Sequence, residues 1–185
     1  MRIEIFDLER GQSLWEHKVE LNLSESGVHP VTLRDLESLG LDLAEIEGLA
    51  LGYVQTNGTP ELRRALSRLY PGSHEDCFEV TNGTAEANYL VTQTLLHTGD
   101  TLLCETPNYL QVSGVARNLG ARVETFGLQQ HLDWAPDWDA FQRGLEHRPR
   151  LIYVSHPNNP TGYVLSEDEV ELIVEGARSV DAWLL

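Results

Sequence analysis

The chain has 185 residues, which is enough for one domain with a sizeable core or for part of a larger one. Its formal net charge of -16 argues against nucleic acid and anionic membranes as partners, because both favour clustered lysine and arginine. The two cysteines, Cys77 and Cys104, lack disulfide or metal-ligand spacing, which suggests a reducing compartment and small core residues rather than nucleophiles.

The first 50 residues have a mixed pattern, and the stretch "LNLSESGVHP" at residues 21–30 is typical of a loop. The N-terminus lacks the basic flank and apolar core of a signal peptide, and no apolar run is long enough to span a bilayer. We therefore expect a cytoplasmic protein. Lys18 is the only lysine of the chain.

From Gly58 onward the pattern becomes regular. The stretch "GTPELRRALSRLYPG" predicts an amphipathic helix with Thr59 as its N-cap and Pro60 at its first position. Short apolar runs then alternate with helical patterns. Strands are predicted at residues 77–80, 101–105, 122–126, 150–154 and 182–185. Helices are predicted near residues 84–97, 109–119, 138–147 and 166–180.

Such alternation is typical of βαβ units, so the sequence predicts an α/β fold, a three-layer α/β/α sandwich with a mostly parallel sheet. The last predicted helix opens with a capping box formed by Ser166 and Glu169. In sheets of this kind, ligands bind beyond the carboxyl ends of the strands. The residues that follow each predicted strand are therefore the candidates for a site.

Three of these strand ends carry candidate ligand residues, and the first two are "TNGTAEANYL" and "TPNYLQVSG". In "TNGTAEANYL", Gly83 permits a tight turn and Thr84 places a hydroxyl beside the amides of the next helix, a ready phosphate site. A strand-to-helix turn needs a glycine and a capping residue in any case. In "TPNYLQVSG", Tyr109 could stack on a flat ligand or cover the end of the sheet as a half-buried ring.

The third strand end is "SHPNNPTG", where Asn159 precedes Pro160. That bond can be cis at low cost, which would aim the Asn159 amide. Turn chemistry explains the prolines and the glycine, but two asparagines between two prolines exceed what a turn requires. Together the three loops predict a flat, phosphorylated, ring-bearing ligand.

These motifs carry a family resemblance. The stretches "YVQTNGTPELRRAL", "VTNGTAEANYL", "ETPNYLQVSG" and "SHPNNPTGYVLSEDEV", in this order and spacing, resemble the large domain of fold-type I pyridoxal-phosphate enzymes, the class I/II aminotransferases. The resemblance implies pyridoxal 5'-phosphate, an amino-acid substrate, a 2-oxo acid and a homodimer, in amino acid metabolism. It also implies that residues 1–50 form an N-terminal arm with part of a small domain, and that residues 51–185 form the N-terminal part of the cofactor-binding large domain.

The resemblance implies roles for single residues toward the cofactor. Gly83, Thr84 and Ala85 would hold the phosphate. Tyr109 would stack on the pyridine ring, and Asn159 would hydrogen-bond its phenolic oxygen.

Three further residues match less specific family positions. Tyr53 matches the tyrosine that reaches the phosphate of the neighbouring subunit. Gly27 sits where the family has a glycine near the substrate carboxylate. The loop "SESGVH" is similar to that of capreomycidine-synthase-like members, which cyclise an arginine derivative, and His29 would then face the substrate. A lone histidine after a glycine turn is more often solvated or packed.

The family also requires a lysine that forms a Schiff base with the cofactor, and Lys18 lies far upstream of the matching position. Asp181 precedes the position of the family's aspartate, which keeps the ring nitrogen of the cofactor protonated. The resemblance therefore implies a chain without its own catalytic residue, a fragment inactive in transamination by itself. It further implies that strands from later sequence separate residues 77–80 from residues 182–185, which leaves sheet edges unpaired.

Two alternatives remain open. One is a non-catalytic interaction or regulatory module that retains the fold, and the other is a pyridoxal-phosphate enzyme of the capreomycidine-synthase type. A dinucleotide-binding oxidoreductase is disfavoured because the chain has no Gly-x-Gly-x-x-Gly turn. The histidines show no metal-ligand spacing, so no metal is expected.

Overall fold

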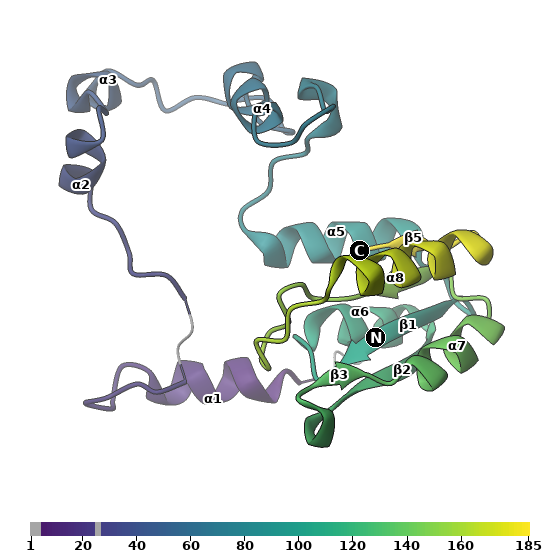
Figure 1. Ribbon diagram of the computed structural model, residues 1–185. Helices are drawn as coiled ribbons and strands as arrows, with labels where there is room; N and C mark the ends of the chain where they lie inside the picture. The colour runs from purple at the N-terminus through teal and green to yellow at the C-terminus, as the bar shows by residue number, and fades with distance from the viewer. Residues whose placement is uncertain (1–4, 25–26) are drawn as a thin grey trace. The chain divides into compact units, whose positions relative to one another are not determined.

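A computed structural model describes residues 5–24 and 27–185 of the chain (Figure 1). By their contacts these residues divide into two units. The first unit comprises Asn82–Leu185 together with the described residues 5–7. The second comprises Leu8–Thr81. No helix among the described residues is both long and apolar enough to cross a membrane.

The first unit is built on a five-stranded sheet with the strand order β3-β2-β1-β4-β5. All neighbouring strands are parallel except β2 and β3, so the predicted, mostly parallel sheet is confirmed. The strands are β1 (Thr101–Thr106), β2 (Arg122–Gln129), β3 (Ala135–Pro136), β4 (Leu151–Tyr153) and β5 (Trp183–Leu184). The sequence pattern missed β3, a two-residue edge strand that contains a proline, which lacks a backbone donor and suits only an edge.

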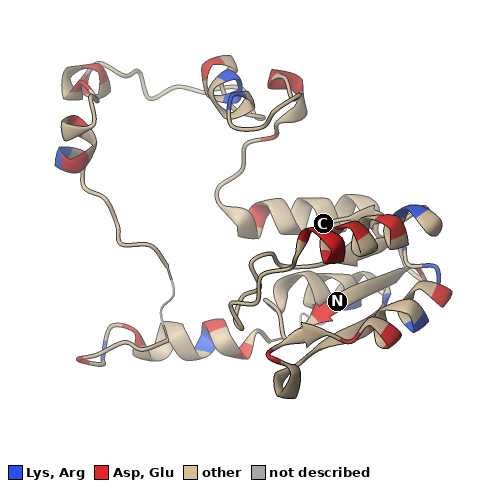
Figure 2. Cartoon of the chain, in the orientation of Figure 1, with Lys and Arg blue, Asp and Glu red and all other residues tan. Residues whose placement is uncertain are grey.

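Four helices cover the two faces of this sheet, which confirms the three-layer α/β/α prediction. They are α5 (Thr84–Leu95), α6 (Gln111–Leu119), α7 (Trp138–Glu146) and α8 (Glu167–Ser179). The capping box of α8 forms as predicted, because the Ser166 and Glu169 side chains each accept the other's backbone N–H. Its first turn is strongly acidic (Figure 2), which suits the positive end of a helix dipole.

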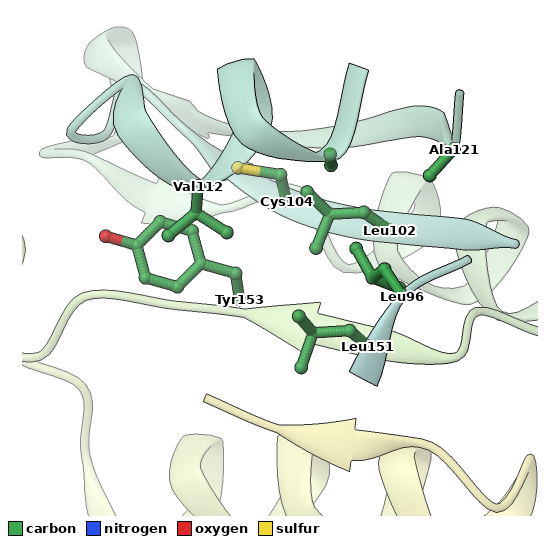
Figure 3. Packing of buried hydrophobic residues seen from close by; sticks show 8 residues of the cluster. Leu96, Leu102, Cys104, Val112, Ala121, Leu151 and Tyr153 are labelled. Carbon is green, nitrogen blue, oxygen red and sulfur yellow. The ribbon is translucent and has the colours of Figure 1, made fainter. Parts of the chain in front are cut away.

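Alternation along the strands produces two apolar clusters, one on each face. On one face, Leu102, Leu151 and Tyr153 pack against α6 and the end of α5 (Figure 3). On the other face, Leu103 and Ile152 pack against α7 and α8. On this second face α7 lies close to the sheet, since a Cβ at Gly144 of α7 would lie 2.5 Å from a Leu103 methyl group of β1.

The second unit contains only short helices. They are α1 (Asp7–Trp15), α2 (Leu33–Ser38), α3 (Leu43–Glu47) and α4 (Pro60–Ser67), followed by the 3-10 turn η1 (Glu75–Cys77). The prediction of α4 is confirmed, and its N-cap Thr59 accepts a hydrogen bond from the Leu62 amide at 3.3 Å. None of the described residues from 8 to 81 is buried.

The predicted strand at residues 77–80 is wrong. Cys77 ends the 3-10 turn, and the following residues have no strand partner in the part of the chain that the structure describes. The Val80 amide donates instead to the Asn57 carbonyl oxygen at 3.2 Å. The apolar run has the composition of a strand, but a strand forms only where another strand supplies a hydrogen-bonding edge.

Candidate functional site

Three segments meet at one edge of the sheet in the first unit. Because β1 and β4 are parallel neighbours, the loops that follow them leave from the same edge. The start of α5 is joined to the first of these loops, since the Gln111 Nε2 donates to the Ala85 carbonyl oxygen at 2.7 Å. We call residues 82–86, 105–111 and 155–162 together the rim.

Helix α5, like α6, begins without a hydrogen bond from a side-chain cap. Its N-cap is Gly83, which supplies no side-chain acceptor for the first amides. Five other helices have such an acceptor, at Thr32, Asp42, Thr59, Asp137 and Ser166. Gly83 has φ of 83°, which an L side chain rarely adopts, and a Cβ built on it would meet no heavy atom within 4 Å.

This geometry fits a phosphate group. Thr84 and Ala85 are exposed in the first turn of a 12-residue helix, where backbone amides and the helix dipole favour an anion. The open space beside Gly83 is where a side chain would otherwise project. The start of α5 thus has both the donors and the room that a phosphate needs.

Tyr109 lies in the loop that leads into α6. Its ring is half-buried, and the ring of Phe6 packs against it edge-on with the centroids 4.7 Å apart. Its backbone N–H donates to Asn108 Oδ1 at 2.7 Å. Gln111, two residues later, donates to the Ala85 carbonyl oxygen. A hydrogen bond therefore connects the loop of Tyr109, the predicted stacking residue, to the predicted phosphate-binding segment at the start of α5.

The loop after β4 uses its two asparagines differently. Asn158 is 4% exposed, and its Oδ1 accepts hydrogen bonds from the backbone N–H and the hydroxyl of Thr161 at 3.0 and 2.7 Å. Asn159 is exposed, and its bond to Pro160 is cis. Asn158 therefore builds the turn, while Asn159 is presented at the surface of the rim.

A buried carboxylate joins the two loops. Glu105, the penultimate residue of β1, is 1% exposed. Its Oε2 accepts hydrogen bonds from Asn158 Nδ2 at 2.7 Å, from the Ser155 N–H at 3.1 Å and from Asn108 Nδ2 at 3.3 Å. Burial raises the pKa of Glu105 above its ordinary value, and the hydrogen bonds from Ser155 and Asn158 and the nearby His156 offset part of the rise.

The sequence pattern did not identify Glu105, Asn108 or Asn158. One signal was present, because Glu105 is a charged residue at the end of the apolar run "TLLCE". Charged residues are seldom fully buried without partners. The partners themselves lie up to 53 positions away in the sequence, and no local pattern connects them.

The remaining predicted residues belong to the other compact unit. Tyr53, Gly27 and His29 are all exposed there, and residues 25–26 of the "SESGVH" loop lie outside the described residues. The Lys18 ammonium lies 5.6 Å from the centroid of the Trp15 ring. Within the described ranges, no group of three or more histidine, cysteine, aspartate or glutamate side chains could hold a metal ion.

Comparisons with known proteins agree on one family. The family model described as "Aminotransferase class I and II" matches residues 17–185. The chain is 33% identical over 173 residues to capreomycidine synthase of Streptomyces vinaceus, a match that covers 90% of this chain and 44% of that protein. It is 33% identical over 136 residues to glutamate-pyruvate aminotransferase AlaA of Escherichia coli strain K12, covering 70% of this chain and 33% of that protein.

Solved structures give the same picture. A PLP-dependent aminotransferase from Streptococcus suis 89-1591 matches with a TM-score of 0.93 at 27% sequence identity. That match covers all of this chain and 50% of the other. The chain thus spans about half the length, or less, of the relatives that it matches.

Proposed function

The chain belongs to the class I and II aminotransferase family, and on that premise we propose that it forms the phosphate-holding and ring-holding part of a pyridoxal-phosphate enzyme acting on an amino acid and a 2-oxo acid. The observation that carries this proposal is the rim, where a helix start without a side-chain cap, a half-buried tyrosine and an exposed asparagine lie on segments that hydrogen bonds join. The cytoplasmic location and the division at residue 50 remain predictions.

When bound, pyridoxal 5'-phosphate supplies an electron sink for chemistry at the substrate α-carbon. In this proposal, the residues of this chain bind the cofactor and orient its phosphate and its ring. The amides of Thr84 and Ala85 would hold the phosphate oxygens, beside the space left open by Gly83. Tyr109 would lie against the pyridine ring, and the Asn159 amide would donate to the phenolic oxygen.

The other unit would contribute in a homodimer and at the substrate. Tyr53 would reach the phosphate of the neighbouring subunit. Gly27 would lie near the substrate carboxylate. Both roles rest on family positions, and Tyr53 and Gly27 are both exposed, as such contacts require.

We further propose that the 185-residue chain does not transaminate by itself. Its single lysine, Lys18, has no match to the family's catalytic lysine. Borohydride reduction after incubation with pyridoxal 5'-phosphate, followed by peptide mapping, tests this point. A stoichiometric adduct on Lys18 together with transamination activity would overturn it.

Titration of the chain with pyridoxal 5'-phosphate tests the proposed binding site. A few neutral hydrogen bonds and one aromatic contact support at best weak binding, with a free energy on the order of -5 kcal/mol. Gly83→Ala should lower the affinity because the new methyl group projects into the open space where the phosphate would bind. Gly99→Ala is the matched control: Gly99 also has positive φ and open space around a Cβ, but it lies before the amino end of β1.

We expect saturable binding that Gly83→Ala weakens at least about tenfold and Gly99→Ala leaves unchanged. Equal losses in both variants would contradict the placement of the phosphate. A folded chain that shows no saturable binding would favour the alternative of a non-catalytic interaction module.

A second candidate is a pyridoxal-phosphate enzyme of the capreomycidine-synthase type. It is favoured by the similarity to that enzyme over 90% of the chain. The rim would serve either reaction, because it holds the cofactor rather than the substrate. The two candidates differ at His29, so substitution of His29 by alanine should weaken substrate binding only in the second.

A further inference from the structure

Glu105 is an unusual residue for its position. It follows the buried residues Leu102, Leu103 and Cys104 in β1 and is 1% exposed, where an apolar side chain would avoid the cost of burying a carboxyl group. Three donors converge on its Oε2, from Asn108 on one loop and from Ser155 and Asn158 on another. Such a cluster is stabilising only while every member keeps its partner.

The two asparagines in this cluster have the same arrangement. Asn108 donates to Glu105 through Nδ2 and accepts the backbone N–H of Tyr109 through Oδ1. Asn158 donates to Glu105 through Nδ2 and accepts from the backbone and hydroxyl of Thr161 through Oδ1. Each amide therefore connects the same carboxylate to the backbone of its own loop.

Each asparagine also directly precedes a residue predicted to contact the cofactor ring, since Tyr109 follows Asn108 and Asn159 follows Asn158. The link between the loops is reinforced because Asn158 Nδ2 also donates to the Pro107 carbonyl oxygen at 3.1 Å. The orientation of both asparagine side chains is thus fixed at two ends, one of which is Glu105.

We propose that Glu105 is a positioning residue that aligns Tyr109 and Asn159 at the rim simultaneously, by holding Asn108 and Asn158. The identity of the ring as pyridoxal 5'-phosphate rests on the proposed function. The connection of the two loops through Glu105 does not depend on the proposed function, and hydrogen exchange tests it without any ligand.

Hydrogen exchange of the unliganded chain tests the connection. Glu105→Leu removes the shared acceptor and should speed exchange in residues 107–111 and 155–162 together. Asn108→Ala should speed exchange only in the first segment. Asn158→Ala should speed exchange mainly in the second segment and, because it also removes the hydrogen bond to the Pro107 carbonyl oxygen, to a smaller extent in the first. Leu151→Ala, a buried residue at the amino end of β4, is the control for general destabilisation and should show no preference for these two loops.

Glu105→Gln keeps one acceptor oxygen and nearly the same shape. It should therefore retain most of the protection, which also guards against a Glu105→Leu variant that fails to fold. Release of one loop alone in Glu105→Leu or Glu105→Gln would overturn the proposal, as would no selective release in either.

Binding of pyridoxal 5'-phosphate tests the consequence for the ligand. We expect Glu105→Leu to weaken binding at least about tenfold and Glu105→Gln to recover most of the affinity. Loop release without any loss of affinity would show a merely structural role and overturn the positioning role. If the wild-type chain does not bind the cofactor, the proposed function fails, while the exchange experiment still decides whether Glu105 couples the loops.

Discussion

The two compact units contain similar kinds of residues but use them differently. Residues 82–185 place their apolar side chains on both faces of a sheet, under four helices, where many are fully buried. Residues 8–81 are also rich in leucine, yet none of the described ones is buried, and Leu51 is completely exposed. Apolar content thus does not make a core unless a sheet or a partner helix faces it.

The predicted site residues are likewise divided between the two units. The rim, with Gly83, Tyr109 and Asn159, belongs to the packed unit, where hydrogen bonds fix its loops. Tyr53 and His29 belong to the exposed unit. We expect the rim to keep its geometry as long as the sheet is folded, and the following experiments test the contrast between the units.

The largest effect is expected in the core between the sheet, α7 and α8. Phe141 is fully buried and packs edge-on against Phe126 at 5.1 Å between ring centroids. Phe141→Ala should lower the free energy of unfolding by about 3–5 kcal/mol, because it leaves a cavity. Leu51→Ala, in the exposed unit, should change it by less than about 0.5 kcal/mol. Urea denaturation measures both, and equal losses would contradict the contrast between the units.

The two cysteines give a contrast in reactivity. Cys77 is exposed, whereas Cys104 is buried in the first core cluster, and burial raises the pKa of its thiol from 9.0 to about 12. The thiolate fraction of Cys104 near pH 8 is then lower by about a thousandfold than that of a thiol with the ordinary pKa. Alkylation in native buffer should modify Cys77 and leave Cys104 unmodified.

Cys77→Ser serves as the control for this labelling, because it leaves Cys104 as the only thiol. This variant should react slowly when folded and fast in urea. Rapid native labelling of Cys104 would mean that the first unit opens readily.

The free energy of unfolding should depend on pH with opposite signs for one carboxyl group in each unit, Glu105 in the first and Asp35 in the second. Burial raises the pKa of Glu105 above 4.5, so the folded state holds its proton more tightly than the unfolded state. Its contribution to stability is full below pH 4.5 and is lost as the pH rises through the raised pKa, with a slope of at most about 1.4 kcal/mol per pH unit. Glu105→Gln should remove this slope, as urea denaturation at a series of pH values would show.

Asp35 in the exposed unit provides the counterpart. Hydrogen bonds from the Thr32 side chain and backbone lower the pKa of Asp35 below 3.8. Its contribution is therefore present above pH 3.8 and is lost as the pH falls through the lowered pKa. Asp35→Asn should remove a pH dependence of the opposite sign, and the same sign in both variants would refute the assignment.

The smallest effects concern helix caps. Ser166→Ala should lower the free energy of unfolding by about 1 kcal/mol, because α8 packs on the sheet and its capping box supports that packing. Thr59→Ala should have a smaller effect on global unfolding, since α4 contains no buried residue and can fray without exposing a core. Denaturation monitored by circular dichroism compares the two, and a larger loss at Thr59 would overturn the reasoning.

Features that depend on neighbouring residues could be predicted from the amino-acid sequence. The caps of α4 and α8, the alternation of strands and helices from residue 84 onward and the motifs of the family are all local, and the family resemblance is confirmed over residues 17–185. A cap needs a side chain within three residues of an amide, and a helix face needs only a repeat of apolar positions, so both are visible without a fold.

Which polar residues are buried and which strands form depends on long-range contacts that the sequence pattern does not reveal. Residues 77–80 have a strand's composition but no partner strand among the described residues, whereas the two residues of β3 pair because β2 lies beside them. Asn158 and Asn159 are adjacent and identical, yet only Asn158 is held by Glu105. The reason is that these interactions join residues up to 53 positions apart, and the register of the sheet, rather than any local pattern, brings them within hydrogen-bonding distance.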